Sequence, residues 1–309
     1  MKKYGFGVDI GGTTCKIGLF ETSGKMLDKW EIPTNKADNG GHILDDVAAS
    51  IDEKMKSASI AKEDVEGIGV GVPGPVLEDG SVSVCVNLGW GQVQVADELS
   101  SKTGLPVKVG NDANVAALGE MWQGGGKGYT GVVMVTLGTG VGGGIIIGGR
   151  IYDGMRGAGA ELGHTLLVMD GEPCTCGRRG CWEAYSSATA LIRQACQAAA
   201  RHPDSLLARL ADVNGKTVFD AADRGDETAR AVVDRYCDYL GAGLVNIVNA
   251  LAPEVILIGG GISRQGERLL APVRRYVERN CFGGKDGAVP VIAPAKLGNE
   301  AGIIGAAAL

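Results

Sequence analysis

The chain has 309 residues, of which 45% are hydrophobic and 21% charged, a composition typical of a globular protein with one large or two medium domains. Its net charge of −6 argues against a nucleic-acid-binding protein, whose affinity rests on basic surface. Asp9 interrupts the first apolar stretch, and the uncharged run 132–149 contains seven glycines, so we expect no signal peptide, no membrane span and a cytoplasmic location.

Strands alternate with helices along the chain, which predicts an α/β architecture. A helix over 43–58 is indicated by apolar residues spaced four apart, Ile43, Val47, Ile51 and Met55. The residues after 298 are mostly small and apolar, which is typical of a helix packed against the rest of the protein. The expected strands are 4–10, 17–20, 67–72, 107–109, 132–137, 144–147 and 255–258, and the expected helices are 43–58, 93–103, 187–200, 228–251, 264–279, one that begins at Asn111-Asp112 and one after residue 298.

An internal repeat relates two glycine turns. Residues 8–13 align without gaps on residues 135–140, an offset of 127 positions. Each segment is a strand, a glycine turn and the start of a returning apolar strand. A duplicated domain would produce this pattern, although glycine hairpins are also common in unrelated proteins. The repeat favours two domains that each direct one glycine turn toward a shared cleft.

Both turns have the composition of a phosphate-binding site. Backbone N–H groups of a glycine turn can approach phosphate oxygens because no Cβ intervenes. Thr13, Thr14 and Thr139 add hydroxyl donors. Asp9, at the end of the first strand, would either hold Mg²⁺, which prefers oxygen ligands, or accept a hydrogen bond from the turn.

Two rival phosphate motifs do not fit. The pattern G-x-x-x-x-G-K-[ST] is absent from the sequence. The pattern G-x-G-x-x-G occurs at 138–143, but it binds a dinucleotide only when a helix follows the turn. Here an apolar strand is expected at 144–147, so a dinucleotide-dependent dehydrogenase is a poor interpretation.

Three thiols and one imidazole fall within eighteen residues, at His164, Cys174, Cys176 and Cys181. Four such ligands fill a tetrahedral zinc site and leave no open position for water. The alternatives are ordinary reduced cysteines, or a disulfide, which a cytosolic protein rarely keeps. A zinc ion here would fold the segment around itself and fix Glu161 and Glu183, which flank the ligands.

Asn111-Asp112 lies between a short strand and an apolar helix. Either residue would serve as the helix N-cap, but a cap explains only one of them. Asp112 is therefore our candidate general base, which would accept a proton from a hydroxyl nucleophile. A polyol needs several paired donors and acceptors, and such a set would form if the cysteine-rich loop folds near this helix; its members would be Asn111, Asp112, Glu161, His164 and Glu183.

These motifs resemble the ROK family of sugar kinases and repressors, and within it the bacterial ATP-dependent glucokinases. The resemblance spans nearly the whole chain in the family's order. It is carried by Asp9-Ile-Gly-Gly-Thr-Thr, Gly71-Val-Pro-Gly-Pro, Asn111-Asp-Ala-Asn, Leu137-Gly-Thr-Gly-Val-Gly-Gly-Gly, Gly157-Ala-Gly-Ala-Glu-Leu-Gly-His, Cys174-Thr-Cys-Gly-Arg-Arg-Gly-Cys-Trp-Glu and Ile258-Gly-Gly-Gly.

The resemblance implies an actin-like ATPase (ribonuclease H-like) fold, with two α/β domains flanking a cleft. A small domain would comprise residues 1–112, completed by a C-terminal helix at about 298–309. A large domain would comprise residues 113–297 and contain the zinc loop. Family kinases are commonly homodimers and close their domains on sugar, which limits wasteful ATP hydrolysis.

The resemblance also implies residue roles. Asp112 would be the base for the sugar 6-hydroxyl, and His164, Cys174, Cys176 and Cys181 the ligands of a structural zinc ion. Sugar contacts would come from Gly74, Asn87, Asn111, Asp112, Glu161, His164 and Glu183. Contacts to ATP and its Mg²⁺ would come from Asp9, Gly11, Gly12, Thr13, Thr14, Lys16, Gly138, Thr139, Gly140, Gly259, Gly260 and Gly261.

The predicted function is that of a hexose kinase, most specifically a glucokinase in sugar breakdown. Kinases for N-acetylmannosamine, N-acetylglucosamine or fructose are the nearest alternatives. A non-enzymatic sugar-sensing regulator is a different class. The family's repressors carry a helix-turn-helix extension before the first glycine turn, and this turn begins here at Gly11, so we expect a kinase.

Overall fold

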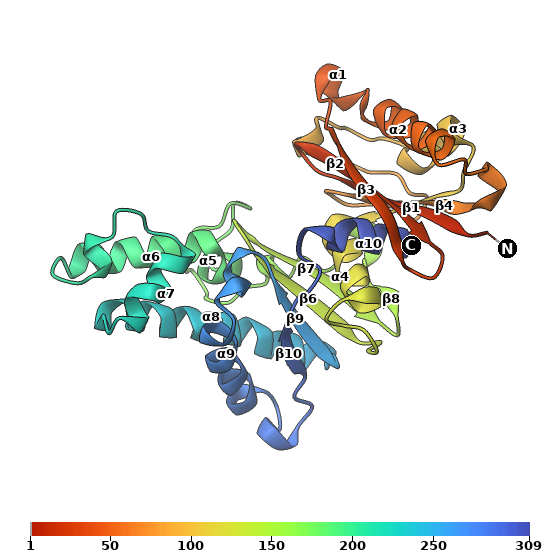
Figure 1. Ribbon diagram of the computed structural model, residues 1–309. Coiled ribbons are helices and arrows are strands. Elements are labelled where there is room, and N and C mark those ends of the chain that lie inside the picture. The colour runs from red at the N-terminus through yellow and green to blue at the C-terminus, as the bar shows by residue number, and fades with distance from the viewer. Residues whose placement is uncertain (1) are drawn as a thin grey trace. The chain divides into compact units, whose positions relative to one another are not determined.

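The computed structural model describes residues 2–309, apart from the side chain of residue 285, and the chain forms two compact units (Figure 1). The first unit consists of Met1–Thr130, Gly144–Ala160 and Leu297–Leu309; the second consists of Gly131–Gly143 and Glu161–Lys296. The chain therefore first passes between units after Thr130, later than the limit near residue 112 that the sequence suggested. The helix that follows Asp112 belongs to the first unit because it packs on the C-terminal helix.

The first unit is built on a five-stranded sheet in the order β3-β2-β1-β4-β5. The first three strands pair antiparallel, whereas β4 and β5 continue the sheet in parallel with β1. A parallel pair requires a crossover, and helices supply it. The strands are β1 (Tyr4–Ile10), β2 (Thr14–Glu21), β3 (Met26–Pro33), β4 (Val65–Val72) and β5 (Val107–Asn111).

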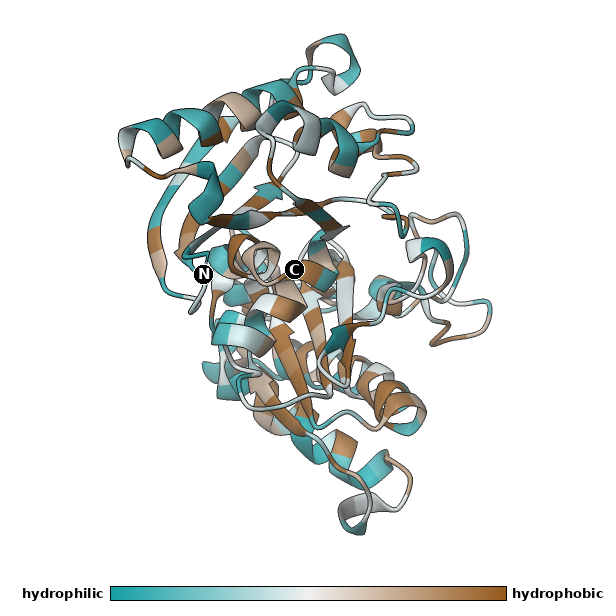
Figure 2. Ribbon diagram, turned by 90° about the vertical axis from the view of Figure 1, so that its right-hand side faces the viewer, coloured by the Kyte–Doolittle hydropathy of each residue, from teal (hydrophilic) through white to brown (hydrophobic). Residues whose placement is uncertain are grey.

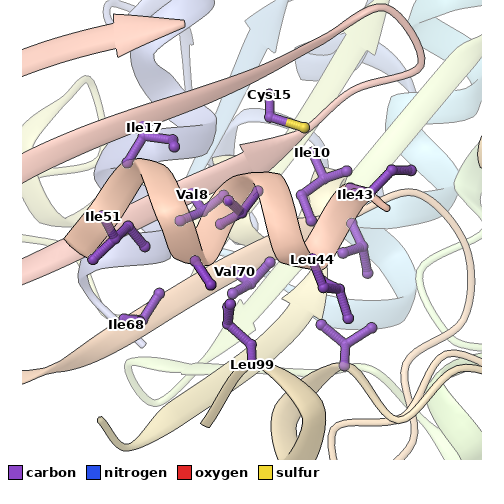
Figure 3. Packing of buried hydrophobic residues seen from close by; sticks show 14 of the residues in the cluster. Val8, Ile10, Cys15, Ile17, Ile43, Leu44, Ile51, Ile68, Val70 and Leu99 are labelled. Carbon is purple, nitrogen blue, oxygen red and sulfur yellow. The ribbon is translucent and has the colours of Figure 1, made fainter. Parts of the chain in front are cut away.

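Alternation along the strands assigns the two faces of this sheet. Val8, Val70 and their apolar neighbours point toward α2 (Ile43–Ser57), whose buried side chains include Ile43 and Ile51 (Figure 3). On the other face, a Cβ on Gly69 would stand 1.7 Å from the carbonyl oxygen of Ala306, so only glycine lets the last helix approach the sheet this closely. The helices of this unit are α1 (Ala37–Gly40), α2, α3 (Val95–Thr103), α4 (Asp112–Gln123) and α10 (Ala301–Ala307).

The second sheet has the order β10-β9-β6-β7-β8. The pairs β10/β9 and β9/β6 are parallel, and β7 and β8 pair antiparallel. Its central strands are apolar and buried on both faces, and they are largely brown in Figure 2. The strands are β6 (Val132–Leu137), β7 (Val141–Ile147), β8 (Arg150–Ile151), β9 (Val255–Gly259) and β10 (Val291–Pro294); β8 and the end of β7 belong to the first unit.

Three helices of the second unit begin at side-chain caps. Ser187 accepts a hydrogen bond from the Ala190 N–H, and Asp226 accepts one from the Ala229 N–H. Asn214 forms a reciprocal capping box with Thr217. The helices are α5 (Glu183–Ser186), α6 (Ala188–Arg201), α7 (Gly215–Asp223), α8 (Glu227–Leu251) and α9 (Glu267–Asn280).

Within residues 2–309, no helix combines the length and the apolar character needed to cross a membrane.

The predicted α/β architecture is confirmed, and every strand and helix expected from the sequence has a counterpart. The repeated segments 8–13 and 135–140 fall on equivalent elements, a strand and glycine turn followed by a neighbouring strand. A strand rather than a helix follows the turn at Gly138, as expected for a protein without a dinucleotide-binding helix. The sequence interpretation missed the edge strands β3, β8 and β10 and the helices α1, α5 and α7.

Candidate functional site

The first glycine turn joins β1 to β2 and is held in place by its neighbours. The Gly11 N–H donates to the Thr14 carbonyl oxygen at 3.0 Å. Thr34 then fixes the turn from β3's end: its N–H donates to the Thr13 carbonyl at 2.9 Å and its hydroxyl to the Gly11 carbonyl at 2.6 Å. The predicted phosphate turn is therefore a defined loop at the end of two paired strands.

Charged side chains lie on both sides of this turn. Asp9 and Lys16 are register partners in β1 and β2. Burial raises the pKa of Asp9, and the positive charge of Lys16 partly offsets that effect. Lys36, which the sequence interpretation did not single out, places its amino group 3.6 Å from the position that a Cβ on Gly12 would occupy. A carboxylate suited to a hard cation and a lysine amino group thus flank the turn.

The hydrogen bonds show which of Asn111 and Asp112 is the N-cap of α4. Asn111 is the N-cap of α4, because its Oδ1 accepts from the N–H groups of Ala113 at 3.0 Å and Asn114 at 3.3 Å. Its Nδ2 donates to the Gly74 carbonyl at 3.1 Å. Asp112, the first residue of the helix, is exposed, and its Oδ1 accepts from the Ala113 N–H at 2.8 Å. The cap is thus Asn111, and the Asp112 carboxylate is not required for it.

The remaining first-unit candidates surround these residues. Asn87 is exposed in the loop after Cys85, and its carbonyl oxygen lies 3.7 Å from the position of a Cβ on Gly12. Burial raises the pKa of the Cys85 thiol, backbone N–H groups lower it, and the charges of Asp112 and Lys36 act on it in opposite directions. Asp112, Asn87 and Lys36 therefore gather on one side of the first unit, near the glycine turn.

The four predicted zinc ligands form a cluster in the second unit. The donor atoms of His164, Cys174, Cys176 and Cys181 all lie within 4.8 Å of one another. Cys174 Sγ is 3.6 Å from His164 Nδ1, and Cys176 Sγ is 3.6 Å from Cys181 Sγ. Zinc bonds of about 2.3 Å to sulfur and about 2.0 Å to nitrogen would separate tetrahedral ligands by roughly 3.5–3.8 Å. The donor set and its spacing therefore fit one tetrahedral zinc ion.

The backbone of the loop creates this spacing. The Cys174 N–H donates to the Arg178 carbonyl at 2.9 Å, and the Gly177 N–H donates to the Cys174 carbonyl at 3.0 Å. Gly180 has φ of +81°, and a Cβ there would meet the Val168 carbonyl oxygen at 1.8 Å, so this turn requires glycine. The loop ends at buried Trp182, whose indole N–H donates to the Tyr239 carbonyl at 3.0 Å and anchors it on α8.

Thiolate chemistry in the loop also suits a metal. The backbone N–H and guanidinium of Arg178 lower the pKa of Cys176 to about 6, so this thiol is largely ionised at neutral pH. Burial raises the pKa of Cys181. A zinc ion would favour the deprotonated form of both.

Glu183, the first residue of α5, connects the zinc loop to the second glycine turn. Its Oε2 accepts from the Val141 N–H at 3.0 Å, just after that turn, and its Oε1 lies 3.3 Å from the Thr175 hydroxyl and 3.6 Å from Cys174 Sγ. Glu161 is exposed, and its carbonyl accepts from the His164 N–H at 3.1 Å. The three polar residues expected to contact sugar from this unit thus lie in or beside one loop.

The second and third glycine turns lie at one edge of the second sheet. Within the turn at 138–140, the Gly138 N–H donates to the Gly140 carbonyl at 3.0 Å, and Thr139 is exposed. Gly260 has φ of +83°, and a Cβ on it would be 2.4 Å from the Leu137 carbonyl oxygen. The turn at 259–261 therefore packs directly against the residue that precedes the turn at 138–140.

A match to a family model identifies the family of this chain. The model of the ROK family matches residues 5–309. This chain belongs to the ROK family. The glucokinase of Halalkalibacterium halodurans is 45% identical over 306 residues, covering 97% of this chain and 92% of that protein. The glucokinase of Streptomyces coelicolor is 39% identical, covering 98% and 96%.

Solved structures give the fold. A ROK family glucokinase from Streptomyces griseus, crystallised with glucose and AMPPNP, is similar with a TM-score of 0.76 and 36% identity, covering 99% of this chain and 98% of that one. ROK sugar kinases have the actin-like ATPase fold with two α/β domains. The predicted fold class is thereby confirmed.

Proposed function

We propose that this ROK protein is an ATP-dependent glucokinase, which converts ATP and D-glucose to ADP and glucose 6-phosphate. The observation that carries the proposal is the nearly full-length likeness to glucokinases, at 45% identity for the first relative described above. The exposed Asp112 carboxylate beside a capping Asn111 supports it. A cytoplasmic location and a homodimeric state, as is common among family kinases, are part of the same proposal.

Asp112 acts as the general base. Its carboxylate accepts the proton of the glucose 6-hydroxyl while that oxygen attacks the γ-phosphorus of ATP. The bond between the γ-phosphorus and the β–γ bridging oxygen breaks, and ADP leaves with the electron pair. Phosphoryl transfer depends mainly on positioning and charge neutralisation, so a base that touches the attacking oxygen is sufficient.

The glycine turns bind ATP. Backbone N–H groups and the hydroxyls of Thr13, Thr14 and Thr139 donate to phosphate oxygens, and the turn at 259–261 lies toward the adenosine. Mg²⁺ supplies positive charge to the phosphate oxygens when it is bound. Asp9 is the carboxylate placed to hold it, directly or through water. Lys16 and Lys36 add positive charge near the first turn.

Polar groups are the proposed contacts for glucose. Asn87, Asn111 and Asp112, together with the backbone at Gly74, are the contacts of the first unit. Glu161, His164 and Glu183 are the contacts of the second unit. A structural zinc ion would be held by Cys174, Cys176, Cys181 and His164, through the Nδ1 that faces Cys174. It would leave His164 Nε2 for a sugar hydroxyl and would fix the loop on which Glu183 depends.

A coupled assay of ADP release from ATP tests the function. The substrates are glucose, mannose, fructose, N-acetylmannosamine and N-acetylglucosamine, each at the same concentration. The highest kcat/KM is expected for glucose. Preference for an acetylated sugar or fructose would assign another kinase of the family, and no ADP release with any sugar would favour the sugar-sensing regulator.

A further inference from the structure

The second unit contains a basic cavity that none of the proposed catalytic or sugar-binding residues lines. Its volume is about 490 Å³, and its walls come from α5, α6, α8 and the start of the zinc loop. Pockets of roughly 300–1,000 Å³ are typical of small-molecule sites. The residues that determine its chemistry are Glu172, Tyr185, Arg193, Arg201, Arg235 and Tyr239.

Positive charge dominates the cavity, although the whole chain carries a net charge of −6. Three guanidinium groups line it against one carboxylate, Glu172. Arg193 lies 3.9 Å from that carboxylate. Among the residues that the structure describes, Arg201 and Arg235 form no ion pair with a carboxylate; Arg201 Nε donates to the carbonyl of Gln197 in its own helix. Two guanidinium groups therefore remain to meet an anion.

Aromatic rings form another part of the wall. The Tyr185 and Tyr239 rings are 4.7 Å apart, and the guanidinium of Arg235 lies 5.4 Å from the Tyr239 ring centroid. This cation–π contact orients Arg235 beside an aromatic surface. Tyr185 is buried, whereas Tyr239 is partly exposed. The cavity thus offers cations for a phosphate and the Tyr239 ring for the carbon skeleton attached to it.

The same cavity is connected to the zinc loop. The Glu172 N–H donates to the Tyr185 hydroxyl at 2.6 Å, and the Glu172 carbonyl accepts from the Gly180 N–H at 2.8 Å. Glu172 is two residues before Cys174, and Tyr185 is two residues after Glu183. Arg193 also donates to the Ala184 carbonyl at 2.7 Å. A ligand that attracts Arg193 away from Glu172 would therefore disturb the loop that carries the proposed sugar contacts.

We propose that this cavity is a regulatory site for a small phosphate monoester, whose phosphate contacts Arg201 and Arg235 and attracts Arg193, and whose carbon skeleton packs on Tyr239. The regulatory part of this inference rests on the proposed glucokinase function. Binding weakens the Arg193–Glu172 contact and lowers the affinity for glucose. By linkage, glucose lowers the affinity for the phosphate monoester by the same factor.

Isothermal titration calorimetry of the full chain tests the site. Glucose 6-phosphate, glycerol 3-phosphate and inorganic phosphate are the probes, and glucose with a non-hydrolysable ATP analogue fills the proposed active site. One equivalent of a phosphate monoester is expected to bind. Binding should weaken about tenfold or more in Arg201→Gln/Arg235→Gln, because the two substitutions remove the charge-assisted hydrogen bonds to the phosphate.

The matched control is Arg209→Gln/Arg279→Gln, which removes two exposed arginines of the same unit that lie outside the cavity. It should bind the probes as the wild type does. Equal weakening in both double variants, or no weakening in Arg201→Gln/Arg235→Gln, overturns the site. Binding of inorganic phosphate as tight as that of both esters overturns the assignment of a monoester.

Steady-state kinetics test the regulation. The monoester that binds is expected to raise the glucose KM of the wild type and to leave that of Arg201→Gln/Arg235→Gln unchanged, with similar basal kcat in both. An unchanged wild-type KM overturns the regulatory role. The calorimetry requires no turnover, so a chain without kinase activity would refute the proposed function while the binding results still decide the cavity.

Discussion

The backbone N–H of Val141 donates a 3.0 Å hydrogen bond to the carboxylate of Glu183. The donor follows the second glycine turn, and the acceptor begins the helix that follows the zinc loop. The other carboxylate oxygen lies 3.6 Å from Cys174 Sγ. One side chain thus links a proposed phosphate turn to a proposed metal ligand. We therefore expect a displacement of Glu183 to affect both.

Replacement of Glu183 separates its structural role from its proposed sugar contact. Glu183→Ala removes the acceptor of the Val141 N–H, so we expect the free energy of unfolding to fall by about 1–2 kcal/mol and the glucose KM to rise. Glu183→Gln keeps an acceptor oxygen and should retain stability while still raising the KM. Urea denaturation and steady-state kinetics measure both. Wild-type KM values in the two variants would exclude the sugar contact.

Elemental analysis tests the metal cluster. We expect one zinc ion per purified chain and its loss in Cys176→Ser, because three ligands hold zinc more weakly than four. Glucose binding should weaken together with the metal content. Cys196→Ser is the control, since Cys196 is exposed on α6 outside the cluster. Full zinc content in Cys176→Ser, or equal loss in both variants, is incompatible with the assignment.

The contact between α4 and α10 predicts a large effect of one methyl group. A Cβ on Gly305 would stand 1.7 Å from the carbonyl oxygen of Val115, and neither backbone can yield without moving its helix. Gly305→Ala should therefore lower the free energy of unfolding by roughly 1–3 kcal/mol. A Cβ on Gly91 would meet no atom within 4 Å, so Gly91→Ala is the matched control. Equal thermal stability of the two variants would refute this packing.

Asp226 should make stability depend on pH. Burial raises the pKa of its carboxyl, but N–H groups of Ala229, Leu206, Leu207 and Thr228 outweigh that effect and hold the pKa below its usual value. A carboxyl with a lowered folded-state pKa stabilises the fold above its unfolded-state pKa, about 3.9, and loses that contribution as the pH falls through the folded-state value.

Asp226→Asn tests this dependence. It should cost about 1–2 kcal/mol at pH 7, because Asn keeps one acceptor oxygen where the carboxylate has two, which accept from the N–H groups of Ala229, Leu206 and Leu207. The difference from wild type should shrink below about pH 4. Denaturant unfolding of both proteins between pH 7 and pH 3.5 gives the difference directly. A difference that stays constant over this range would show that the Asp226 charge contributes nothing.

The features that could be predicted are those encoded by residues close together in the sequence. Apolar runs that end in glycine identified β1, β6 and β9, and the ligand spacing identified the cluster at His164–Cys181. The cap at Asn111 could not be distinguished from Asp112 by residue type, because both favour that position; only the hydrogen bonds from Ala113 and Asn114 assign it.

Long-range features were not predictable in this way. The strand β3 mixes charged and apolar residues and lies at a sheet edge, so it has no continuous apolar run. Lys36 approaches Gly12 only through the fold of the first unit. The cavity of Arg201 and Arg235 combines residues of two helices that are separated in sequence by a third, α7.

The most direct test of the proposed chemistry is Asp112→Asn, measured by ADP release with glucose and by calorimetric glucose binding. Asn keeps the shape and hydrogen-bonding capacity of the side chain but cannot take a proton, and Asp97→Asn on α3 is the control. If Asp112 is the general base, the variant should have a glucose affinity near that of the wild type and a kcat reduced by roughly 10²–10⁴-fold. A kcat close to that of the wild type would contradict it.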